Sequence, residues 1–538
     1  MSESPNQARS VAKAAAALNV GGKSSAAPLT GKRPIELVFG LVGPTGVDQA
    51  AVAAALIRQL AAMNYESVEI SLSDVIAGYD SNGLRFEDEF DRISSLMSMG
   101  DDLRRRAERA DIIALLGIIK IRAERARISG KQTEPSETRR IAYLVRSFKR
   151  PEEVALFRDV YGKAFSLISI YASRPSRIEN LRKRFIGRNR GPKDERTPSE
   201  LAHHLMNRDN KEESDEDYGQ RVGDTFPLAD YFVVSEIRSK IDKQLERLVR
   251  LIFGDPYISP SADEQAMYFA QVAALRSLDL SRQVGAAIVA EDGSLVSTGC
   301  NDVPRAGGGL YWADDESCER DFERGLDANV EVKKELVIDA LNRLKGAKLL
   351  NLPEGENIEN LAKKLLFDKP AVLGDSKLFD VIEFGRSVHA EMAAITHAAR
   401  VGSATDGMRL FCTTFPCHIC ARHIVSSGIK EVVFIEPYEK SRVAELYQDS
   451  IVVEPVEKST DRVAFRSFFG VAPRRYLDFF QPATSRKSRS GSIRPIQEIA
   501  QNPRIKRITF TYTSAEEAVI SEATLPPKGP TPTKESSP

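Results

Sequence analysis

The chain has 538 residues, which is too long for one ordinary hydrophobic core and predicts two or three structural units, two being the simplest division. Hydrophobic residues make up 42% of the chain and charged residues 28%, which excludes a fibrous or wholly disordered protein. The 76 Lys and Arg residues are matched by 76 Asp and Glu residues. A net charge of zero disfavours a non-specific nucleic-acid binder, so a small-molecule ligand is the better expectation.

Residues 1–32 lack apolar periodicity and are expected to form a disordered arm. A buried-strand pattern over residues 35–43 then leads into a glycine-rich turn and an Ala-rich helix over residues 48–62. Further strands are predicted over residues 67–72, 141–146, 164–171 and 230–234, and helices over residues 101–127, 151–161 and 235–253. This alternation predicts a parallel sheet with helices on both faces, in a P-loop, nucleoside-kinase-like domain over residues 33–254.

The glycine-rich turn resembles a Walker A loop, G-x-x-x-x-G-K-[ST], whose backbone amides hold nucleotide phosphates. Four of its residues are candidate nucleotide-binding residues: Gly40, Gly43, Thr45 and Gly46. However, Val47 stands in place of the Lys and Asp48 in place of the Ser or Thr, and an Asp there would repel phosphate. The turn is therefore degenerate, and we expect a kinase-like fold without NTP hydrolysis.

A basic stretch over residues 173–193 resembles the lid of a kinase, which would hold phosphates. The alternative is an ordinary solvated basic helix, neutralised by the acidic run over residues 212–217. Three roles stay open for this domain: nucleotide sensing, RNA binding and assembly.

The Gly254-Asp255-Pro256 break marks the predicted start of a second α/β domain over residues 255–480, followed by a C-terminal tail over residues 481–538. Helices and strands alternate in this domain as well. A long helical insertion over residues 315–367 interrupts it, and its apolar spacing fits either core packing or an interface.

Two short motifs in the second domain have the pattern of a zinc site. His389-Ala390-Glu391 stands at the predicted start of one helix, and Pro416-Cys417-His418-Ile419-Cys420 at the start of another. One imidazole (His389) and two thiolates (Cys417 and Cys420) leave the fourth tetrahedral position of Zn²⁺ open for water, as a catalytic site requires. Zinc makes hydroxide available near neutral pH. Glu391 is expected to move protons without being a ligand.

The combination H-x-E with P-C-x-x-C is typical of zinc deaminases acting on cytosine or adenine. The alternative is a purely structural zinc site, or two unrelated fragments. Five cysteines, an odd number without regular spacing, disfavour a secreted disulfide framework. No run approaches the roughly 20 apolar residues of a membrane span, and no signal peptide is evident, so a cytoplasmic protein without a membrane partner is expected.

Four motifs together resemble the deoxycytidylate deaminase family: residues 282–289 (RQVGAAIV), 298–301 (TGCN), 389–391 (HAE) and 413–420 (TTFPCHIC). The resemblance implies a cytidine-deaminase-like α/β/α domain. It also implies that Asn301 contacts the substrate sugar and that Tyr438 lines the pocket near the nucleotide. For Asn301 the alternative is that it only stabilises the turn after Gly299.

The fusion of a P-loop-like unit to such a domain resembles the bacterial antiviral cytidine deaminases. This resemblance implies hydrolysis of free dCTP or dCMP to deoxyuridine nucleotides with release of ammonia, which would deplete deoxycytidine nucleotides during phage infection. It further implies an inhibitory small RNA as a partner and a homo-oligomer. Two alternatives stay open: a polynucleotide deaminase, disfavoured by a single Trp and zero net charge, and a regulatory nucleotide- or RNA-binding protein with structural zinc.

Overall fold

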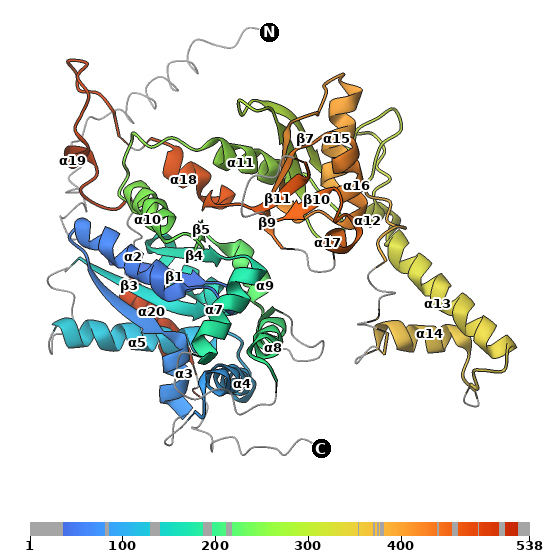
Figure 1. Ribbon diagram of the computed structural model, residues 1–538, viewed down its shortest axis with the longest axis horizontal. Helices are drawn as coiled ribbons and strands as arrows, with labels where there is room; N and C mark the ends of the chain where they lie inside the picture. The colour runs from blue at the N-terminus through green and yellow to red at the C-terminus, as the bar shows by residue number, and fades with distance from the viewer. Residues whose placement is uncertain are drawn as a thin grey trace, which may run out of the picture.

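The computed structural model contains two six-stranded sheets (Figure 1). It describes residues 36–80, 86–129, 140–186, 196–210, 218–352, 355–368, 372–373, 376, 381–437, 441–454, 461–482, 484–504, 512–523 and 525. The expected arm over residues 1–32 and the candidate residue Tyr438 lie outside these ranges. None of the helices in the described ranges is both long and apolar enough to span a bilayer.

The first sheet has the strand order β12-β5-β4-β1-β3-β2, and all of its neighbours are parallel except β12, which pairs antiparallel with β5. Its strands are β1 (Leu37–Val42), β2 (Glu66–Ser71), β3 (Ile141–Phe148), β4 (Phe165–Tyr171), β5 (Tyr231–Val234) and β12 (Gly470–Val471). The fold class predicted for the N-terminal region, a parallel α/β sheet, is confirmed.

Helices cover both faces of the first sheet, so strand residues alternate between two cores. Leu37, Phe39 and Leu41 of β1 pack with α2 and α10, whereas Val38 and Val42 pack with α5 and α6. Burial on both faces explains the continuous apolar runs in these strands. The helices of this unit are α2 (Gln49–Ala62), α3 (Leu72–Asp80), α4 (Glu89–Ala107), α5 (Ile112–Ser129), α6 (Pro151–Tyr161), α7 (Arg174–Ile186), α8 (Pro198–Asn210), α9 (Val222–Thr225) and α10 (Arg238–Ile252).

The single helix predicted over residues 101–127 is wrong, because α4 and α5 are separate helices there. Helix α4 ends at Glu108, whose φ of 49° is left-handed and whose backbone N–H bonds back to the last carbonyls of the helix. Such a residue stops a helix as glycine usually does. Glutamate is not a typical helix-ending residue, so this break has no clear signal in the sequence.

The second sheet has the order β10-β11-β9-β8-β6-β7, with β6 antiparallel to both neighbours and the other pairs parallel. Its strands are β6 (Gly285–Val289), β7 (Leu295–Cys300), β8 (Arg409–Thr414), β9 (Glu431–Glu436), β10 (Ile451–Val453) and β11 (Val463–Ser467). Helices α15 and α16 pack on one face and α11 on the other. The predicted α/β/α arrangement is therefore confirmed.

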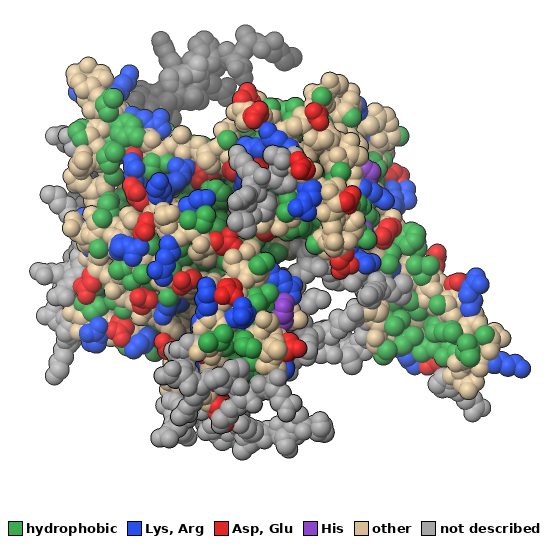
Figure 2. Space-filling view, in the orientation of Figure 1, with side chains coloured by type: hydrophobic (Ala, Val, Ile, Leu, Met, Phe, Trp, Pro, Cys, Tyr) green, Lys and Arg blue, Asp and Glu red, His purple; other side chains and the backbone are tan. Residues whose placement is uncertain are grey.

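The insertion forms a helical hairpin, α13 and α14, that projects from the rest of the molecule in Figure 1. It has a small core of its own, made of Val337, Leu341, Ala362 and Leu366. Figure 2 shows hydrophobic side chains on this hairpin, while Lys and Arg are interspersed with Asp and Glu over the face in view. The helices that follow β5 and α10 are α11 (Ala262–Ala274), α12 (Asp321–Arg324), α13 (Ala328–Gly346), α14 (Ile358–Phe367), α15 (Ala390–Arg400), α16 (His418–Ser426), α17 (Val443–Leu446), α18 (Tyr476–Phe480), α19 (Ile496–Ile499) and α20 (Tyr512–Glu522).

The two sheets share a hydrophobic core. Phe232 of β5 packs with Phe468, and Met267 of α11 and Phe411 of β8 belong to the same cluster. Strand β12 comes from the end of the second unit but completes the first sheet. The segment expected to be a tail beyond residue 480 also contributes α20, which packs on the first unit. The two units are therefore interlocked rather than joined only at residues 254–256.

Candidate active site

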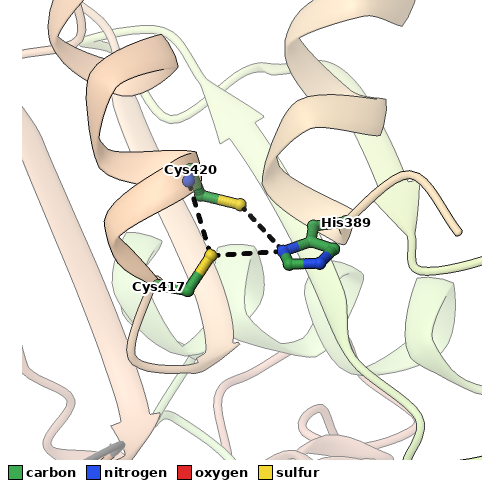
Figure 3. A group of neighbouring side chains, drawn as sticks. All are labelled: His389, Cys417 and Cys420. Carbon is green, nitrogen blue, oxygen red and sulfur yellow. Dashed lines mark hydrogen bonds between the residues drawn. The ribbon is translucent and has the colours of Figure 1, made fainter. Parts of the chain in front are cut away.

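Three side chains from two helix starts meet in one place, as Figure 3 shows. The Sγ atoms of Cys417 and Cys420 each lie 3.3 Å from Nδ1 of His389. The ligand atoms of the three residues all lie within 4.8 Å of one another. The structure thus brings together the three residues that the sequence proposed as metal ligands.

Local structure places each ligand at a helix N-terminus. His389 is the N-cap residue of α15 and Cys417 is the N-cap residue of α16, where its Sγ accepts a hydrogen bond from the Cys420 N–H at 3.5 Å. The positive end of a helix favours thiolate over thiol. A backbone bridge between Val388 and Asp302 fixes the residue before His389 against the segment that follows β7.

The side chains of this group shift one another's pKa values. Hydrogen bonding to Cys420, followed by hydrogen bonding to His389, lowers the pKa of Cys417 to about 4. The hydrogen bond to Cys417 raises the pKa of His389 to about 8. A buried thiolate beside an imidazole is therefore favoured in this pocket even before any metal is considered.

The donor set fits Zn²⁺. Tetrahedral zinc with ordinary Zn–S and Zn–N bond lengths would separate sulfur and nitrogen ligands by about 3.6 Å. The two observed S–N distances of 3.3 Å are close to that value. One histidine and two cysteines are three protein ligands, as in catalytic zinc sites that keep one position open.

Glu391 lies in the first turn of α15, is only 4% exposed and approaches the ligand sulfurs. Its Oε2 is 3.5 Å from Sγ of Cys420. Burial is the main cause that raises the pKa of Glu391 above its ordinary value. A carboxyl group held beside the metal ligands, without belonging to the ligand cluster, has the position expected of a proton carrier.

A cavity of about 240 Å³ opens onto His389, Glu391 and Cys417. This volume lies slightly below the roughly 300 Å³ at the lower end of ordinary small-molecule sites, so the cavity suits one small ligand. Residues of the segment between β7 and α15 also line it, among them Asp321, Asn329 and Arg386. The start of the insertion and the segment that follows it therefore form part of the cavity wall.

Two arginines at this cavity were not among the predicted site residues. Arg282 donates to Glu436 at 2.7 Å, and Arg386 donates to Asp321 at 2.6 Å. Arg282 belongs to the RQVGAAIV motif, so its place in that motif was an available signal. Arg386 follows the insertion, and only the folded chain brings it beside Asp321, near the start of the insertion.

Asn301 lines the cavity but its side chain is engaged by the backbone. Its Oδ1 accepts from the Val284 N–H at 2.7 Å, and its Nδ2 donates to the Arg282 carbonyl at 2.8 Å. Asn301 therefore holds the segment before β6 in place, and one Nδ2 hydrogen and one Oδ1 lone pair are left to reach a ligand. A sugar contact from Asn301 stays a prediction, as does the role of Tyr438, which lies outside the described residues.

The degenerate Walker A turn does not line this cavity and lies at the end of β1. Gly43, Thr45 and Gly46 line a second, larger cavity, whereas Gly40 lies within β1, where a Cβ would meet the rings of Phe148 and Phe165 at 2.8–2.9 Å. Close packing against these two rings is enough to explain the glycine at position 40. Asp48 is the N-cap of α2 and accepts from the Ala51 N–H at 3.0 Å, which explains an Asp at this position.

The fold and the site define an α/β/α domain with a one-histidine, two-cysteine metal site and a neighbouring glutamate. Residues 260–436 match the family model described as the cytidine and deoxycytidylate deaminase zinc-binding region. This match covers about a third of the chain. The match supports cytidine or deoxycytidylate deaminase chemistry in general.

Two relatives match shorter segments. The chain is 39% identical over 74 residues to ComE operon protein 2 of Bacillus subtilis (strain 168), covering 13% of this chain and 39% of that protein. It is 46% identical over 55 residues to the deoxycytidylate deaminase of Enterobacteria phage T2, covering 10% of this chain and 29% of that protein. The matches thus span well under half the length of these relatives.

Two solved structures also align with the chain. The dCMP deaminase of cyanophage S-TIM5 in complex with dCMP and dUMP aligns with a TM-score of 0.22 and 18% identity, over 39% of this chain and 100% of that one. A gluconokinase from Sinorhizobium meliloti 1021 aligns with a TM-score of 0.21 and 12% identity, over 40% of this chain and 95% of that one.

Proposed function

We propose that this protein is a zinc-dependent hydrolase that deaminates free deoxycytidine nucleotides, dCMP, dCTP or both, to deoxyuridine nucleotides. The observation that carries the proposal is the meeting of His389, Cys417 and Cys420 beside the buried Glu391 on the wall of a small cavity. The match of residues 260–436 to a deaminase zinc-binding region supports it. The zero net charge of the chain favours a free nucleotide over a polynucleotide strand.

His389, Cys417 and Cys420 would hold the zinc ion, which supplies Lewis-acid activation of water near neutral pH. Glu391 takes a proton from the attacking water and delivers it to the ring nitrogen next to the amino-bearing carbon. It then moves the second proton of that water, from the hydroxyl now bonded to the ring carbon, to the departing amino group, so that cytosine and water become uracil and ammonia.

The first test is turnover of dCMP, dCTP, CTP, dATP and a cytosine-containing DNA oligonucleotide, followed by ammonia release and product mass. Glu391→Gln should lower turnover by roughly 10²–10⁴-fold, because a positioned acid–base group contributes about that much. The variant should keep its zinc, measured by elemental analysis. Glu445→Gln, which changes an exposed carboxylate of the same unit, is the matched control and should leave turnover unchanged.

The outcomes separate the alternatives. Editing of the oligonucleotide alone would replace the free-nucleotide proposal with a polynucleotide deaminase. A zinc-loaded protein that binds nucleotides but releases no ammonia, and is unaffected by Glu391→Gln, would indicate a regulatory protein with structural zinc. Removal of zinc by a chelator should abolish turnover, and added Zn²⁺ should restore it.

We further propose a biological role in anti-phage defence, by depletion of deoxycytidine nucleotides. Cells carrying the wild-type chain should lose dCTP and dCMP after phage infection, and cells carrying Glu391→Gln should not. Copurified RNA and oligomeric state, measured on the same preparations, test the proposed small inhibitory RNA and the proposed homo-oligomer. Unchanged nucleotide pools in infected wild-type cells would contradict the defence role while leaving the deaminase proposal intact.

A further inference from the structure

A second cavity, in the first unit, lies at the carboxyl ends of β1, β2 and β3. Its volume is about 760 Å³, three times that of the deaminase cavity. Ligands of open parallel sheets bind at this edge. The deaminase chemistry uses none of the residues that line this cavity.

The phosphate-binding groups of the Walker-like turn are already occupied by carboxylates of the chain itself. Asp209 of α8, which is fully buried, accepts a hydrogen bond from the Thr45 N–H at 2.5 Å and also pairs with Nζ of Lys149. At the start of α2, Asp48 accepts from the Ala51 N–H. A backbone amide, a lysine and a helix N-terminus are the groups that would otherwise hold phosphates.

Helix α7 closes over the same turn. The Asn180 side chain donates to the Gly46 carbonyl at 3.0 Å, and a Cβ on Gly46 would meet the Arg177 backbone at 2.7 Å. The turn, α7 and α8 therefore form one closed arrangement in which Asp209 takes the place of a phosphate. The β- and γ-phosphates of a nucleoside triphosphate would have to displace this carboxylate.

The rest of the cavity keeps groups suited to a smaller anionic ligand. Six Arg or Lys side chains and two Asp side chains line it. Arg92 and Arg184 share a single carboxylate, that of Glu89. Arg146 contacts Glu69 at 3.4 Å without a well-formed hydrogen bond. This wall, away from the turn, can bind a single phosphate group.

Buried polar atoms and apolar side chains complete the cavity. Within the described part of the chain, Nε of Arg104 and Oε1 of Gln220 make no hydrogen bond, although Arg104 is 1% exposed and Gln220 5% exposed. Buried polar atoms without partners are uncommon and point to a missing ligand or water. Apolar residues suited to a flat ring also line the cavity: Ile76, Ile93, Leu96, Met97 and Ile113.

We propose that this cavity binds a nucleoside monophosphate. Its phosphate lies against Arg146, Arg92 and Arg184, and its base lies among the apolar side chains near Gln220. Asp209, bound to the Thr45 N–H and Lys149, excludes triphosphates. The N-terminal unit is on this basis a binding module for monophosphates that lacks the phosphate-transfer site of a kinase.

Equilibrium dialysis of the full chain against radiolabelled dAMP, dGMP and dTMP, each tested separately, would check the proposal. The chain should carry Glu391→Gln, so that binding is measured without turnover at the deaminase site. We expect one molar equivalent of at least one monophosphate to bind, and the corresponding triphosphate to bind at least tenfold more weakly. Arg146→Ala should weaken monophosphate binding at least tenfold.

Two further variants make the result specific. Arg400→Ala, at an exposed arginine of the second unit, is the matched control and should leave binding unchanged. Asp209→Asn, checked for folding by its melting temperature, should reduce the difference in affinity between triphosphate and monophosphate. Three results would each overturn the proposal. They are no binding of any of the three monophosphates, tighter binding of a triphosphate than of its monophosphate by the chain that keeps Asp209, and monophosphate binding by Arg146→Ala as tight as that without this substitution.

Discussion

Two glycines in the deaminase motifs are required by close packing between strands and helices. A Cβ on Gly299 of β7 would lie 2.3 Å from the Ala390 carbonyl oxygen and 2.4 Å from the Ala394 nitrogen, both in α15. A Cβ on Gly285 of β6 would meet the backbone of α11 at 2.0 Å. Gly299 thus lets β7 approach the helix that carries His389 and Glu391. Its part in the TGCN motif is to bring the site's elements together.

Gly299→Ala should therefore destabilise the protein by roughly 1–3 kcal/mol or more, the usual cost of overpacking a dense core. It should also lower deaminase turnover, because α15 must shift. The matched control is Gly346→Ala at the end of α13, where a Cβ would meet no described atom within 4 Å. Urea denaturation should show a neutral or slightly stabilising effect for the control. Equal stability of the two variants would contradict the packing argument.

At the scale of elements, the C-terminal helix α20 is held by a buried ion-pair cluster. Glu516 is fully buried and accepts from both terminal nitrogens of Arg125, at 2.7 and 2.9 Å, and from the Tyr161 hydroxyl at 2.9 Å. Arg125 also pairs with Glu36, so one guanidinium links α5, α20 and the segment before β1. Apolar residues of α20 pack on the same core. The helix is thus part of the first unit.

Removing one member of a buried ion pair leaves the other charge without compensation. Glu516→Gln is expected to lower the free energy of unfolding by about 3 kcal/mol, with Glu36 as a residual partner for Arg125. Glu517→Gln, at the adjacent exposed position, should change stability by less than about 0.5 kcal/mol. Chemical denaturation of both variants measures the difference. A Glu516→Gln protein as stable as the control would show that α20 does not dock through this cluster.

At the scale of the whole molecule, Glu454 connects the two sheets. It follows β10 of the second sheet and accepts from the Ser467 backbone N–H and hydroxyl at 2.8 and 2.7 Å. Tyr171, at the end of β4 in the first sheet, also hydrogen-bonds to it. Burial raises the pKa of Glu454 above its ordinary value, and these hydrogen bonds only partly oppose the effect. A carboxyl group that prefers its neutral form therefore lies between the units.

A carboxyl group whose pKa is raised by folding stabilises the folded state below its unfolded pKa of about 4.3, and this contribution is lost as pH rises through the folded value. Glu454→Gln removes the titration but keeps an acceptor for Ser467. The stability of the wild-type chain should therefore fall relative to this variant as pH rises above the unfolded pKa of about 4.3. Urea denaturation at a series of pH values provides the measurement. A difference that does not change with pH would contradict the assignment.

Some of the predicted helices and strands agree with the structure because the sequence signals for them are local. The strand predicted over residues 141–146 lies within β3, and the helix predicted over residues 48–62 is α2 with Asp48 as its cap. His389 and Cys417 were expected at helix starts and are N-cap residues. Periodicity and capping act over a few residues, so the sequence displays them directly. The break at Glu108 was missed because a non-glycine residue takes the left-handed conformation there.

The sequence by itself determined the α/β class and the three candidate metal ligands, since both depend on residue type and short spacing. Only the tertiary structure decided three other features. Asp209 reaches Thr45 across 164 positions, β12 completes a sheet begun by β1, and Arg386 joins the deaminase cavity from beyond the insertion. Each depends on contacts between segments far apart in the chain, which form only when burial of apolar surface folds the two units together.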